Sequence, residues 1–568
     1  MIGTLLVLAA TVTIPEGYWP ETRSNEILAK TETTRLAPDL SGLKANERAA
    51  LDDLLKVGDI MQLLYEEQRH HQARSAHAAL VKLHEASGKS KRTQNLLTLY
   101  RLSHGPIAAT LDNKREAFLP VDPQLPGKNM YPLDVTKEEL DAFIAANPAR
   151  RDELLAERTV VRRASKASIE RDRSILAKHP ALRELHPELT ARLSGMETNA
   201  KAFYAVPYSL AYADQLFEAQ RLLMSAATKL EPTDAEFARY LRNRGRDLIT
   251  NDYESGDASW VTGRFGRFNA QIGSYESYDD ALYGAKAFHS MSILVTNDAA
   301  TQELRRALGS LQEVENALPY ESQKQVRSDI PVGVYEVVAD FGQARSANTA
   351  TILPNDPLFA RRYGRTILLR ENIMRHPDIF AADLRVFRAV TVPAHANDYA
   401  AEGNFLRTLW HEIGHYLGPN GDSLDEYADS VEEMKSDLVS LFALHRMKHP
   451  SLRAIQAGGI RRTLQNVKPR SDQPYQVMQL IQFNWFLDKG LLTADESGKL
   501  TIHYDKYQDT VTSLLREMLR LQATGDKAAT AKFYDQWTKW TDLHEKVAAR
   551  IREAQGARWR LMTYAAID

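Results

Sequence analysis

Apolar residues recur along most of this chain at spacings of three and four, which is the pattern of amphipathic helices. The pattern is clear over residues 51–64 and 151–230, where Pro180, Pro187 and Pro207 interrupt it, and it returns from about residue 400 onward. Thr136 is followed three residues later by Glu139, which is the spacing of a helix-capping signal. The chain is therefore predicted to be mostly α-helical.

One region has a different pattern. Residues 330–370 contain three runs of β-branched and apolar residues, Val332–Val337, Thr349–Leu353 and Thr366–Leu369, bounded by Gly, Pro and Asn. Such runs are typical of strands, so we expect a small sheet here. A mostly helical chain with one small sheet belongs to the α+β class.

The composition excludes several kinds of site and partner. The 568 residues carry 72 basic and 74 acidic side chains, a formal net charge of −2, which gives no electrostatic reason to expect nucleic acid as a partner. The chain has no cysteine, so disulfides, thiolate zinc sites and cysteine nucleophiles are excluded. A metal site must therefore use His, Asp or Glu. The composition does not predict the oligomeric state.

The N-terminus carries a short apolar run, Leu5–Val12, with Ala9 and Ala10 at a plausible signal-cleavage point. No Lys or Arg precedes this run, so residues 1–20 are either an atypical export signal or an N-terminal extension with a first strand. An exported and a cytoplasmic location both stay open. Other apolar runs fall well short of the roughly 20 residues that cross a bilayer, so no integral membrane association is expected.

The metal chemistry of the chain is concentrated in His411–His415, which reads His-Glu-Ile-Gly-His. Side chains four apart lie on one face of a helix, so His411 and His415 can present ring nitrogens to one ion. Glu412 can then reach a water bound to that ion. Apolar residues precede the motif, and Gly418-Pro419 is expected to end the helix.

A catalytic zinc held by two histidines needs one more protein ligand. The next segment is a second amphipathic helix, with apolar residues at spacings of three and four from Tyr427 to Leu441. Glu432 and Glu433 lie beside that stripe, and Asp437 follows Glu433 by four. This spacing puts two carboxylates on one face, where one can ligate the metal and the other can accept a hydrogen bond from a ligand histidine. Two such helices are the pattern of glutamate-ligand zinc peptidases.

The two motifs resemble those of the dipeptidyl peptidase III family of zinc peptidases. The family's catalytic helix has two or three residues between His-Glu and the second His, and His411–Pro419 has the shorter form. The family's second motif is Glu-Glu-x-Arg/Lys-x-Glu/Asp, which Glu432–Asp437 matches.

The resemblance implies a role for each matching residue. The implied ligands of one zinc ion per chain are His411, His415 and Glu433. The flanking acids, Glu432 and Asp437, would support the two histidines.

Weaker likenesses extend over most of residues 40–560. Ile272–Asp280 resembles the family's Ile-Gly-x-x-Glu-x-Tyr-x-Asp segment, and Tyr131–Glu139 resembles an early motif of the bacterial members. Leu353-Pro354-Asn355 resembles a Pro-Asn element, which implies that Asn355 helps to hold the amino end of a substrate.

The resemblance also implies an architecture of two lobes around a deep cleft. A mixed lobe with a small β-barrel or sheet would comprise residues 21–289 and 336–382. A helical lobe carrying the zinc site would comprise residues 290–335 and 383–568. An exposed strand of the mixed lobe would bind an extended peptide by β-augmentation.

The chain departs from the family at three places. The family's acidic residue before Ile-Gly, which grips the free amine of the peptide, aligns with Asn269, and a tyrosine that stabilises the transition state aligns with Gln271. The stretch Ser471–Gln476 lacks a histidine that serves the same end. The zinc ligands and the general base of the family are kept, while the residues that give the family its dipeptidyl specificity and stabilise the oxyanion are changed. The sequence therefore predicts a metal hydrolase more firmly than a dipeptidyl peptidase.

We therefore expect a zinc metallopeptidase in which Glu412 takes a proton from a zinc-activated water and passes it to the leaving amine. Its substrates would be oligopeptides, from whose N-terminus it could release dipeptides. Two alternatives stay open: a zinc hydrolase with a different specificity, and a catalytically weak relative that binds peptides.

The residues expected to contact the substrate are Asn355, Asn269 and Tyr275. A donor must also steady the tetrahedral oxyanion, and the candidates are Tyr475, Tyr275 and Arg470.

Overall fold

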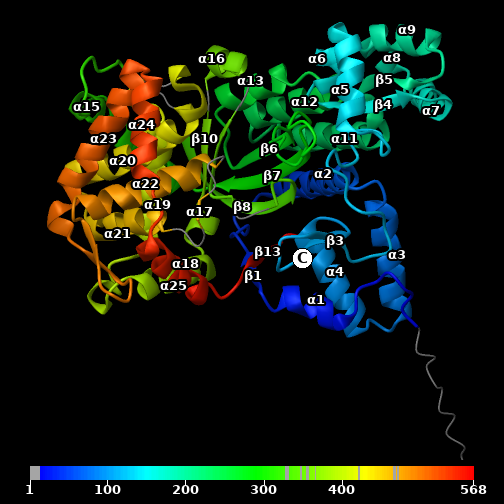
Figure 1. The fold of residues 1–568 in the computed structure, drawn as a ribbon. Helices are drawn as coiled ribbons and strands as arrows, with labels where there is room; N and C mark the ends of the chain where they lie inside the picture. The colour runs from blue at the N-terminus through cyan, green and yellow to red at the C-terminus, as the bar shows by residue number, and fades with distance from the viewer. Residues whose placement is uncertain are drawn as a thin grey trace, which may run out of the picture.

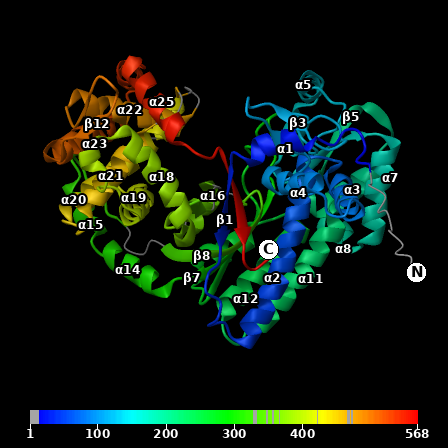
Figure 2. The ribbon, with the colours of Figure 1, turned by 90° about the horizontal axis from the view of Figure 1, so that it is seen from below.

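The computed structural model describes residues 13–326, 332–345, 348–353, 357–364, 366–419, 422–464, 468–469 and 473–567. These residues form two lobes, one mixed and one helical, which lie side by side in Figures 1 and 2. The predicted α+β class, mostly helical and with two lobes, is confirmed. The apolar run Leu5–Val12 lies outside the described residues. None of the helices in the described ranges is both long enough and apolar enough to cross a membrane.

The mixed lobe is built around the long helix α2 (Ala45–Arg69), which packs on two strands of the central sheet. The predicted cap at Thr136 is confirmed, because the Thr136 hydroxyl accepts a hydrogen bond from the Glu139 N–H at 3.2 Å. The other helices of this lobe are α1 (Glu21–Leu28), α3 (Ala73–Ala86), α4 (Lys91–Ser103), α5 (Lys137–Ala146), α6 (Arg151–Leu155), α7 (Lys166–Lys178), α8 (Ala181–Leu185), α9 (Pro187–Gly195), α10 (Tyr208–Ala211), α11 (Ala213–Leu230), α12 (Ala235–Thr250), α13 (Glu254–Thr262) and α16 (Pro357–Tyr363).

A five-stranded sheet lies where the two lobes meet, with the strand order β6-β7-β8-β10-β9. Strand β7 pairs antiparallel with β6 and with β8, β10 runs parallel to β8, and β9 pairs antiparallel with β10. One edge of the sheet is therefore β9. The strands are β6 (Phe268–Ser274), β7 (His289–Thr296), β8 (Val332–Gly342), β9 (Ala350–Leu353) and β10 (Thr366–Arg370).

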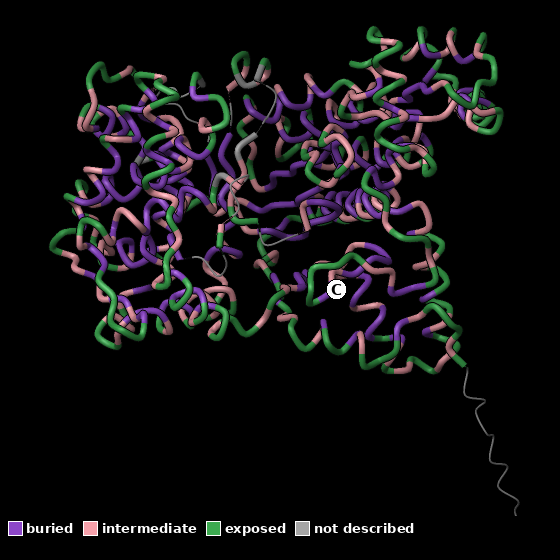
Figure 3. The backbone as a smooth tube through the Cα atoms, viewed as in Figure 1, coloured by how far each residue is buried: buried purple, intermediate pink, exposed green. Residues whose placement is uncertain are grey.

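Strand β10 is buried on both faces because each face belongs to a different lobe. Ile367 and Leu369 pack into the core of the helical lobe, while Leu368 packs into the core of the mixed lobe. Figure 3 shows the central strands buried between the more exposed outer helices. A strand covered on both faces reads as a continuous apolar run, which is why Thr366–Leu369 could be recognised from the sequence.

The predicted sheet was too small. Strands β8, β9 and β10 lie in the expected region, but β6 and β7 were not predicted as strands. Residues 151–230, predicted as helical, also contain the antiparallel pair β4 (Thr159–Ala164) and β5 (Asn199–Pro207). A further two-stranded sheet joins β2 (Ile107–Ala109) to β3 (Arg115–Ala117).

The helical lobe has its own apolar core and holds the two predicted metal-binding helices. A small antiparallel pair, β11 (Leu492–Ala494) and β12 (Leu500–Ile502), lies among its helices. These helices are α14 (Asp298–Leu308), α15 (Leu311–Ala317), α18 (Pro377–Val390), α19 (Ala401–Gly414), α20 (Ala428–Arg446), α21 (Leu452–Thr463), α22 (Pro474–Asp488), α23 (Tyr507–Thr524), α24 (Lys527–Trp537) and α25 (Asp542–Ala554), with the short α17 (Glu371–Met374) next to the sheet.

After α25 the chain returns to the mixed lobe. Strand β13 (Trp559–Tyr564) pairs in parallel with β1 (Thr31–Leu36), and Figure 1 shows the two together. The buried Tyr564 hydroxyl lies 3.3 Å from an Asp340 carboxylate oxygen on β8. Both β7 and β13 pack in the mixed core, although the predicted ranges place most of them in the helical lobe. Apart from these strands, the predicted lobe boundaries stay a prediction.

Candidate metal centre

The centre lies where helices α19 and α20 cross. His411 and Glu412 are in the last turn of α19, and His415 is its C-terminal capping residue. The helix ends at Gly414 rather than at the expected Gly418-Pro419, but His415 keeps helical dihedral angles, φ −63° and ψ −21°, and so stays on the His411 face. A Cβ at Gly414 would lie 2.9 Å from the Ser436 Cα on α20. A glycine is therefore needed for the two helices to approach this closely.

Three side chains of these helices converge on one point. The Glu433 Oε2 atom lies 3.1 Å from His411 Nε2 and 3.9 Å from His415 Nε2. Each of the three residues offers a ligand atom, and these atoms all lie within 4.8 Å of one another. Glu433 Oε2 is buried and has no hydrogen-bond partner among the described residues. A buried carboxylate oxygen facing two imidazole nitrogens is the donor set that zinc takes, so these residues fit a zinc ion.

The opposite nitrogen of each histidine is held by a carboxylate. His411 Nδ1 lies 2.8 Å from Asp437 Oδ1, and His415 Nδ1 lies 2.9 Å from Glu432 Oε1. A ring that donates its Nδ1–H to a carboxylate leaves the Nε2 lone pair for a metal. Glu432 and Asp437 thus lie behind the two histidines, and their role in supporting a bound metal stays a prediction.

The charges of the centre favour this arrangement. Burial alone would lower the pKa of His411, but the neighbouring Asp437 and Glu433 carboxylates raise this pKa to about 9. Without a metal the His411 ring is therefore protonated at neutral pH, and a bound metal would replace that proton. Burial would raise the pKa values of Asp437 and Glu432, yet the cations beside them hold both well below their usual range. Both supporting carboxylates are therefore anionic at neutral pH.

The cations that hold these carboxylates were not predicted. Arg407, one turn before His411 on α19, donates through Nη1 to Asp437 Oδ1 at 2.9 Å, and Arg462 Nε lies 3.6 Å from Asp437 Oδ2. The only sequence signal for Arg407 was its spacing of four from His411, which placed both on one helix face.

Lys435 holds Glu432 in the same way. Its Nζ donates to Glu432 Oε1 at 2.7 Å and to the carbonyl oxygens of Gly414 and Leu417, each at 2.8 Å. These two carbonyls flank His415, the candidate ligand that lies just beyond the end of α19. Lys435 therefore fixes both the backbone around His415 and the carboxylate that holds its ring. Gln522 donates to the other Glu432 oxygen at 2.7 Å.

Two polar side chains lie next to the ligands without belonging to them. Glu412 is partly buried, and burial raises its pKa above the usual range of a carboxyl group. The Tyr475 hydroxyl, from the first turn of α22, bonds the Glu433 carboxylate, and its pKa is raised by burial and by the Glu433 charge. The Tyr475 side chain is 48% exposed, and the Arg462 guanidinium lies 5.4 Å from its ring centre. The Glu412 carboxyl and the Tyr475 hydroxyl thus both lie beside the three candidate ligands.

The other predicted site residues lie elsewhere or were not described. Asn269 is buried on β6, where its amide accepts from Trp260 Nε1 at 2.8 Å and donates to the Tyr335 hydroxyl at 3.0 Å. The Tyr275 hydroxyl donates to Asp257 Oδ1 at 2.7 Å, within the mixed lobe. Asn355 and Arg470 lie outside the described residues. The substrate contacts of all these residues stay a prediction, and Tyr475 is the oxyanion donor candidate that the fold brings to the metal ligands.

Comparison with known proteins gives the fold. No family model matches the sequence. The chain is 23% identical over 446 residues to Nudix hydrolase 3 of Arabidopsis thaliana, a match that covers 74% of this chain and 55% of that protein, so the chain spans about half the length of this curated relative.

Two solved structures share the architecture of nearly the whole chain. Dipeptidyl peptidase III from Caldithrix abyssi superposes with a TM-score of 0.78 at 23% identity, covering 95% of this chain and 98% of that one. Dipeptidyl peptidase III from Corallococcus sp. strain EGB superposes with a TM-score of 0.71 at 24% identity, covering 96% of this chain and 97% of that one. The chain therefore has the fold of these two dipeptidyl peptidase III structures.

Proposed function

We propose that the chain is a zinc-dependent metallopeptidase, with zinc held by His411, His415 and Glu433. The observation that carries this proposal is the buried, unpartnered Glu433 Oε2, which faces the Nε2 atoms of His411 and His415. Each of these rings is held at its Nδ1 atom by a carboxylate. The likeness to two dipeptidyl peptidase III structures supports the same reading of the site. Zinc is the natural ion for two imidazoles and one carboxylate.

The side chains around the ligands supply the rest of the chemistry. When bound, zinc polarises the scissile carbonyl and lowers the pKa of a coordinated water towards neutrality. Glu412 takes a proton from the attacking water and passes it to the leaving amine, and its raised pKa brings it closer to the working pH of such a base. Tyr475 donates a hydrogen bond to the oxyanion of the tetrahedral intermediate.

The edge strand of the sheet supports a peptide substrate. An extended oligopeptide would add to β9 by main-chain hydrogen bonds, and it would lie between the mixed lobe and the zinc-bearing helical lobe. Asn355, Asn269 and Tyr275 are the side chains proposed to hold its amino end. On this reading the chain would release dipeptides from the N-terminus of oligopeptides.

A second candidate is a zinc hydrolase that does not require the free amine. Both hydrogen-bonding atoms of the Asn269 amide are engaged, with Trp260 and Tyr335, and Gln271 accepts from Arg370 Nη2 at 2.9 Å. Neither residue carries the negative charge that would attract an ammonium group. This closed arrangement favours a specificity other than the dipeptidyl one.

Zinc analysis of purified protein tests the metal site. We expect about one zinc per chain in the wild type and in Glu412→Ala, and little zinc in Glu433→Ala, with hydrolysis present in the wild type alone. A well-folded wild type that takes up no zinc when it is offered would overturn the proposal. Zinc uptake without hydrolysis of any peptide would instead indicate a catalytically weak, peptide-binding relative. Comparing amino-blocked with free peptides separates the two specificities.

A further inference from the structure

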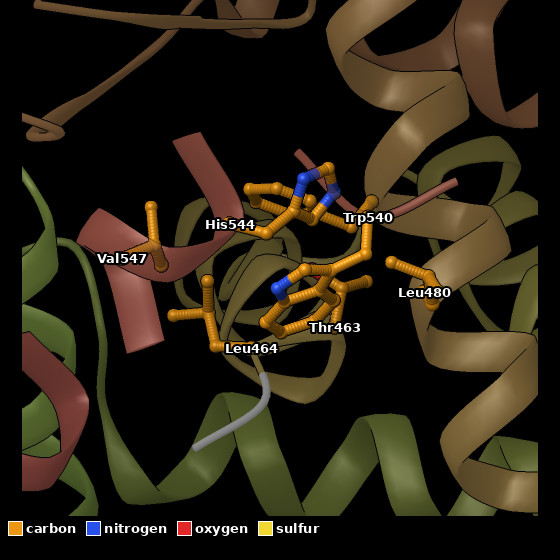
Figure 4. Close-up of a pocket in the computed structure, with 7 residues that line it drawn as sticks. Thr463, Leu464, Leu480, Trp540, His544 and Val547 are labelled. Atoms are coloured by element: carbon orange, nitrogen blue, oxygen red, sulfur yellow. The ribbon is translucent and has the colours of Figure 1, made fainter. Parts of the chain in front are cut away.

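The cavities of the two lobes differ in kind. The space drawn in Figure 4 lies between α21, α22 and α25, is about 10 Å³, and has mostly apolar walls. The one imidazole in its wall, His544, has both ring nitrogens engaged, with the Thr541 hydroxyl and the Asn484 amide oxygen, each at 2.8 Å. This space is a packing gap at the lower limit for one water molecule.

A cavity of about 80 Å³ with a mixed polar and apolar lining lies over the end of the central sheet in the mixed lobe. Hydrogen-bonding side chains from all five strands, or from the turns that follow them, line it. They include Gln271, Ser290, Ser292, Gln343, Thr351 and Arg370. Because Thr351 belongs to β9, the cavity adjoins the edge strand on which a peptide would add.

Two of these side chains are almost fully buried and each has an unused hydrogen-bonding atom. Gln343 is 8% exposed, and its Nε2 donates to Asp279 Oδ2 at 3.0 Å, while its Oε1 has no partner among the described residues. Arg370 is 2% exposed, and its Nε likewise has no partner within the described part of the chain. Gln343 and Arg370 both line this cavity, and buried polar atoms without partners are costly. A ligand here that offers one donor and one acceptor would satisfy both atoms.

The charges around the cavity select against an ionic ligand. Arg370 Nη1 lies 3.2 Å from Asp340 Oδ2, so its charge is balanced inside the protein. The partner of Gln343, Asp279, lies 3.9 Å from Arg69 Nε. An additional carboxylate would meet Glu276 in the cavity wall, and an additional ammonium would meet Arg370. A neutral group with one acceptor and one donor suits this environment.

We propose that this cavity is a specificity pocket for a carboxamide side chain, glutamine or asparagine, of a peptide bound along β9. The amide oxygen accepts from Arg370 Nε and the amide NH₂ donates to Gln343 Oε1. The space holds several water molecules, since about 10–15 Å³ of such space is enough for one, and it is therefore large enough for a carboxamide group. The inference rests on the proposed peptidase function and adds a substrate preference to it.

The test is a set of otherwise identical peptides in which one position in turn carries Gln, Met or Glu. Met has a similar length without hydrogen bonds, and Glu has the same shape with a charge. With zinc-loaded wild type we expect Gln to exceed both by about tenfold or more in kcat/KM at one position, because a site built for hydrogen bonds rejects analogues that lack them. In Gln343→Met the Gln-to-Met ratio at that position should fall to about one.

Gln68 provides the matched control. It is a fully buried glutamine on α2 that does not line the cavity, and its Oε1 accepts from the His289 N–H at 2.8 Å. Gln68→Met should keep the wild-type Gln-to-Met ratio even where it lowers stability. Equal rates for Gln and Met at every position, or a preference that survives in Gln343→Met, would overturn the assignment of the pocket while leaving the peptidase function intact.

If the wild type hydrolyses none of the peptides, the proposed peptidase function is overturned instead. The pocket is then tested by calorimetric binding of the same peptides to wild type and to Gln343→Met. Tighter binding of the Gln peptide that is lost in the variant supports the pocket, and equal binding of the Gln and Met peptides overturns it.

Discussion

Replacing Lys435 by methionine tests whether the fully buried lysine of the second motif positions the metal ligand His415. Methionine has a similar length and is apolar, so it should fill the same space without donating hydrogen bonds. The change removes three hydrogen bonds, two to the carbonyls of Gly414 and Leu417 and one to Glu432. It leaves Glu432 with Gln522, His415 and the Ser436 hydroxyl as its partners.

The expected effect has two parts. Removing one partner of a buried ion pair costs about 3–5 kcal/mol, and we expect the lower end, about 3 kcal/mol, because the Glu432 side chain is 31% exposed. Loss of support behind a ligand histidine lowers metal affinity about 10- to 100-fold, which is about 1.4–2.7 kcal/mol. The stability loss appears in the metal-free protein, and the affinity loss appears only when zinc binds.

Lys286 is a matched control. It is fully buried in the mixed lobe and donates to the Leu154 and Ala156 carbonyls at 2.6 and 2.9 Å and to the Thr159 hydroxyl at 2.6 Å. Lys286→Met should cost a comparable amount of stability, about 3 kcal/mol, because it also removes three hydrogen bonds, one of them to the buried Leu154 carbonyl. Its zinc affinity should stay that of the wild type. Lys435→Arg keeps the positive charge and should recover most of the affinity.

The assay is zinc competition with a chelator of known affinity, combined with urea unfolding of the metal-free proteins. If Lys435→Met and Lys286→Met lose stability alike and both keep wild-type zinc affinity, Lys435 serves the fold alone and does not position His415. If Lys435→Arg binds zinc as weakly as Lys435→Met, the positive charge at this position does not support zinc binding.

Three further predictions concern the same centre. Glu412→Gln should retain zinc, measured by elemental analysis, and lose peptide hydrolysis by at least about 100-fold, because an amide cannot accept the proton; near-wild-type turnover would exclude Glu412 as the base. Tyr475→Phe should lower kcat about 100- to 1,000-fold with little change in melting temperature, because Tyr475 is a half-exposed residue whose hydroxyl serves the oxyanion rather than the core; an unchanged kcat would assign that donor elsewhere. Gly414→Ala should lower stability to urea by about 1–3 kcal/mol, because its Cβ would lie 2.9 Å from the Ser436 Cα. Gly458→Ala is the control, because its Cβ would meet nothing nearer than 3.6 Å. Its stability to urea should be unchanged or rise by about 0.5–1 kcal/mol, because alanine favours the helix more than glycine does.

The sequence could predict that His411, His415 and Glu433 would lie together, because the geometry of each pair is local. His411 and His415 are four apart on one helix, and Glu433 and Asp437 are four apart on another, so each spacing fixes a helix face directly. The contacts of Lys435 could not be predicted, because in sequence it reads as a polar residue on a helix surface. Its burial depends on how closely α19 approaches α20, which is a tertiary fact.

The strands that were missed lack a strand pattern. Strand β6 is buried at every position, yet its sequence Phe268–Ser274 is neither alternating nor rich in β-branched residues. It is a strand because it pairs along its length with β7 and because the Tyr240 hydroxyl from α12 donates to the Ala270 carbonyl at 2.8 Å. The same limit applies to Asn269, whose hydrogen-bond partner Tyr335 lies 66 residues away and cannot be read from the sequence around it.

The pairing of β1 with β13 also sets an order of events during synthesis. Arg560 on β13 donates to the Thr34 hydroxyl at 2.6 Å, across a separation of 526 residues. At the usual rates of translation, β1 leaves the ribosome roughly 25–100 s before its partner exists. During that time β1 is an unpaired strand edge, and the mixed core lacks Met562 and Tyr564. The lobe whose sequence begins first is therefore completed after the helical lobe, and a nascent chain stalled before β13 would expose β1 to chaperones or to the same strand of a neighbouring chain.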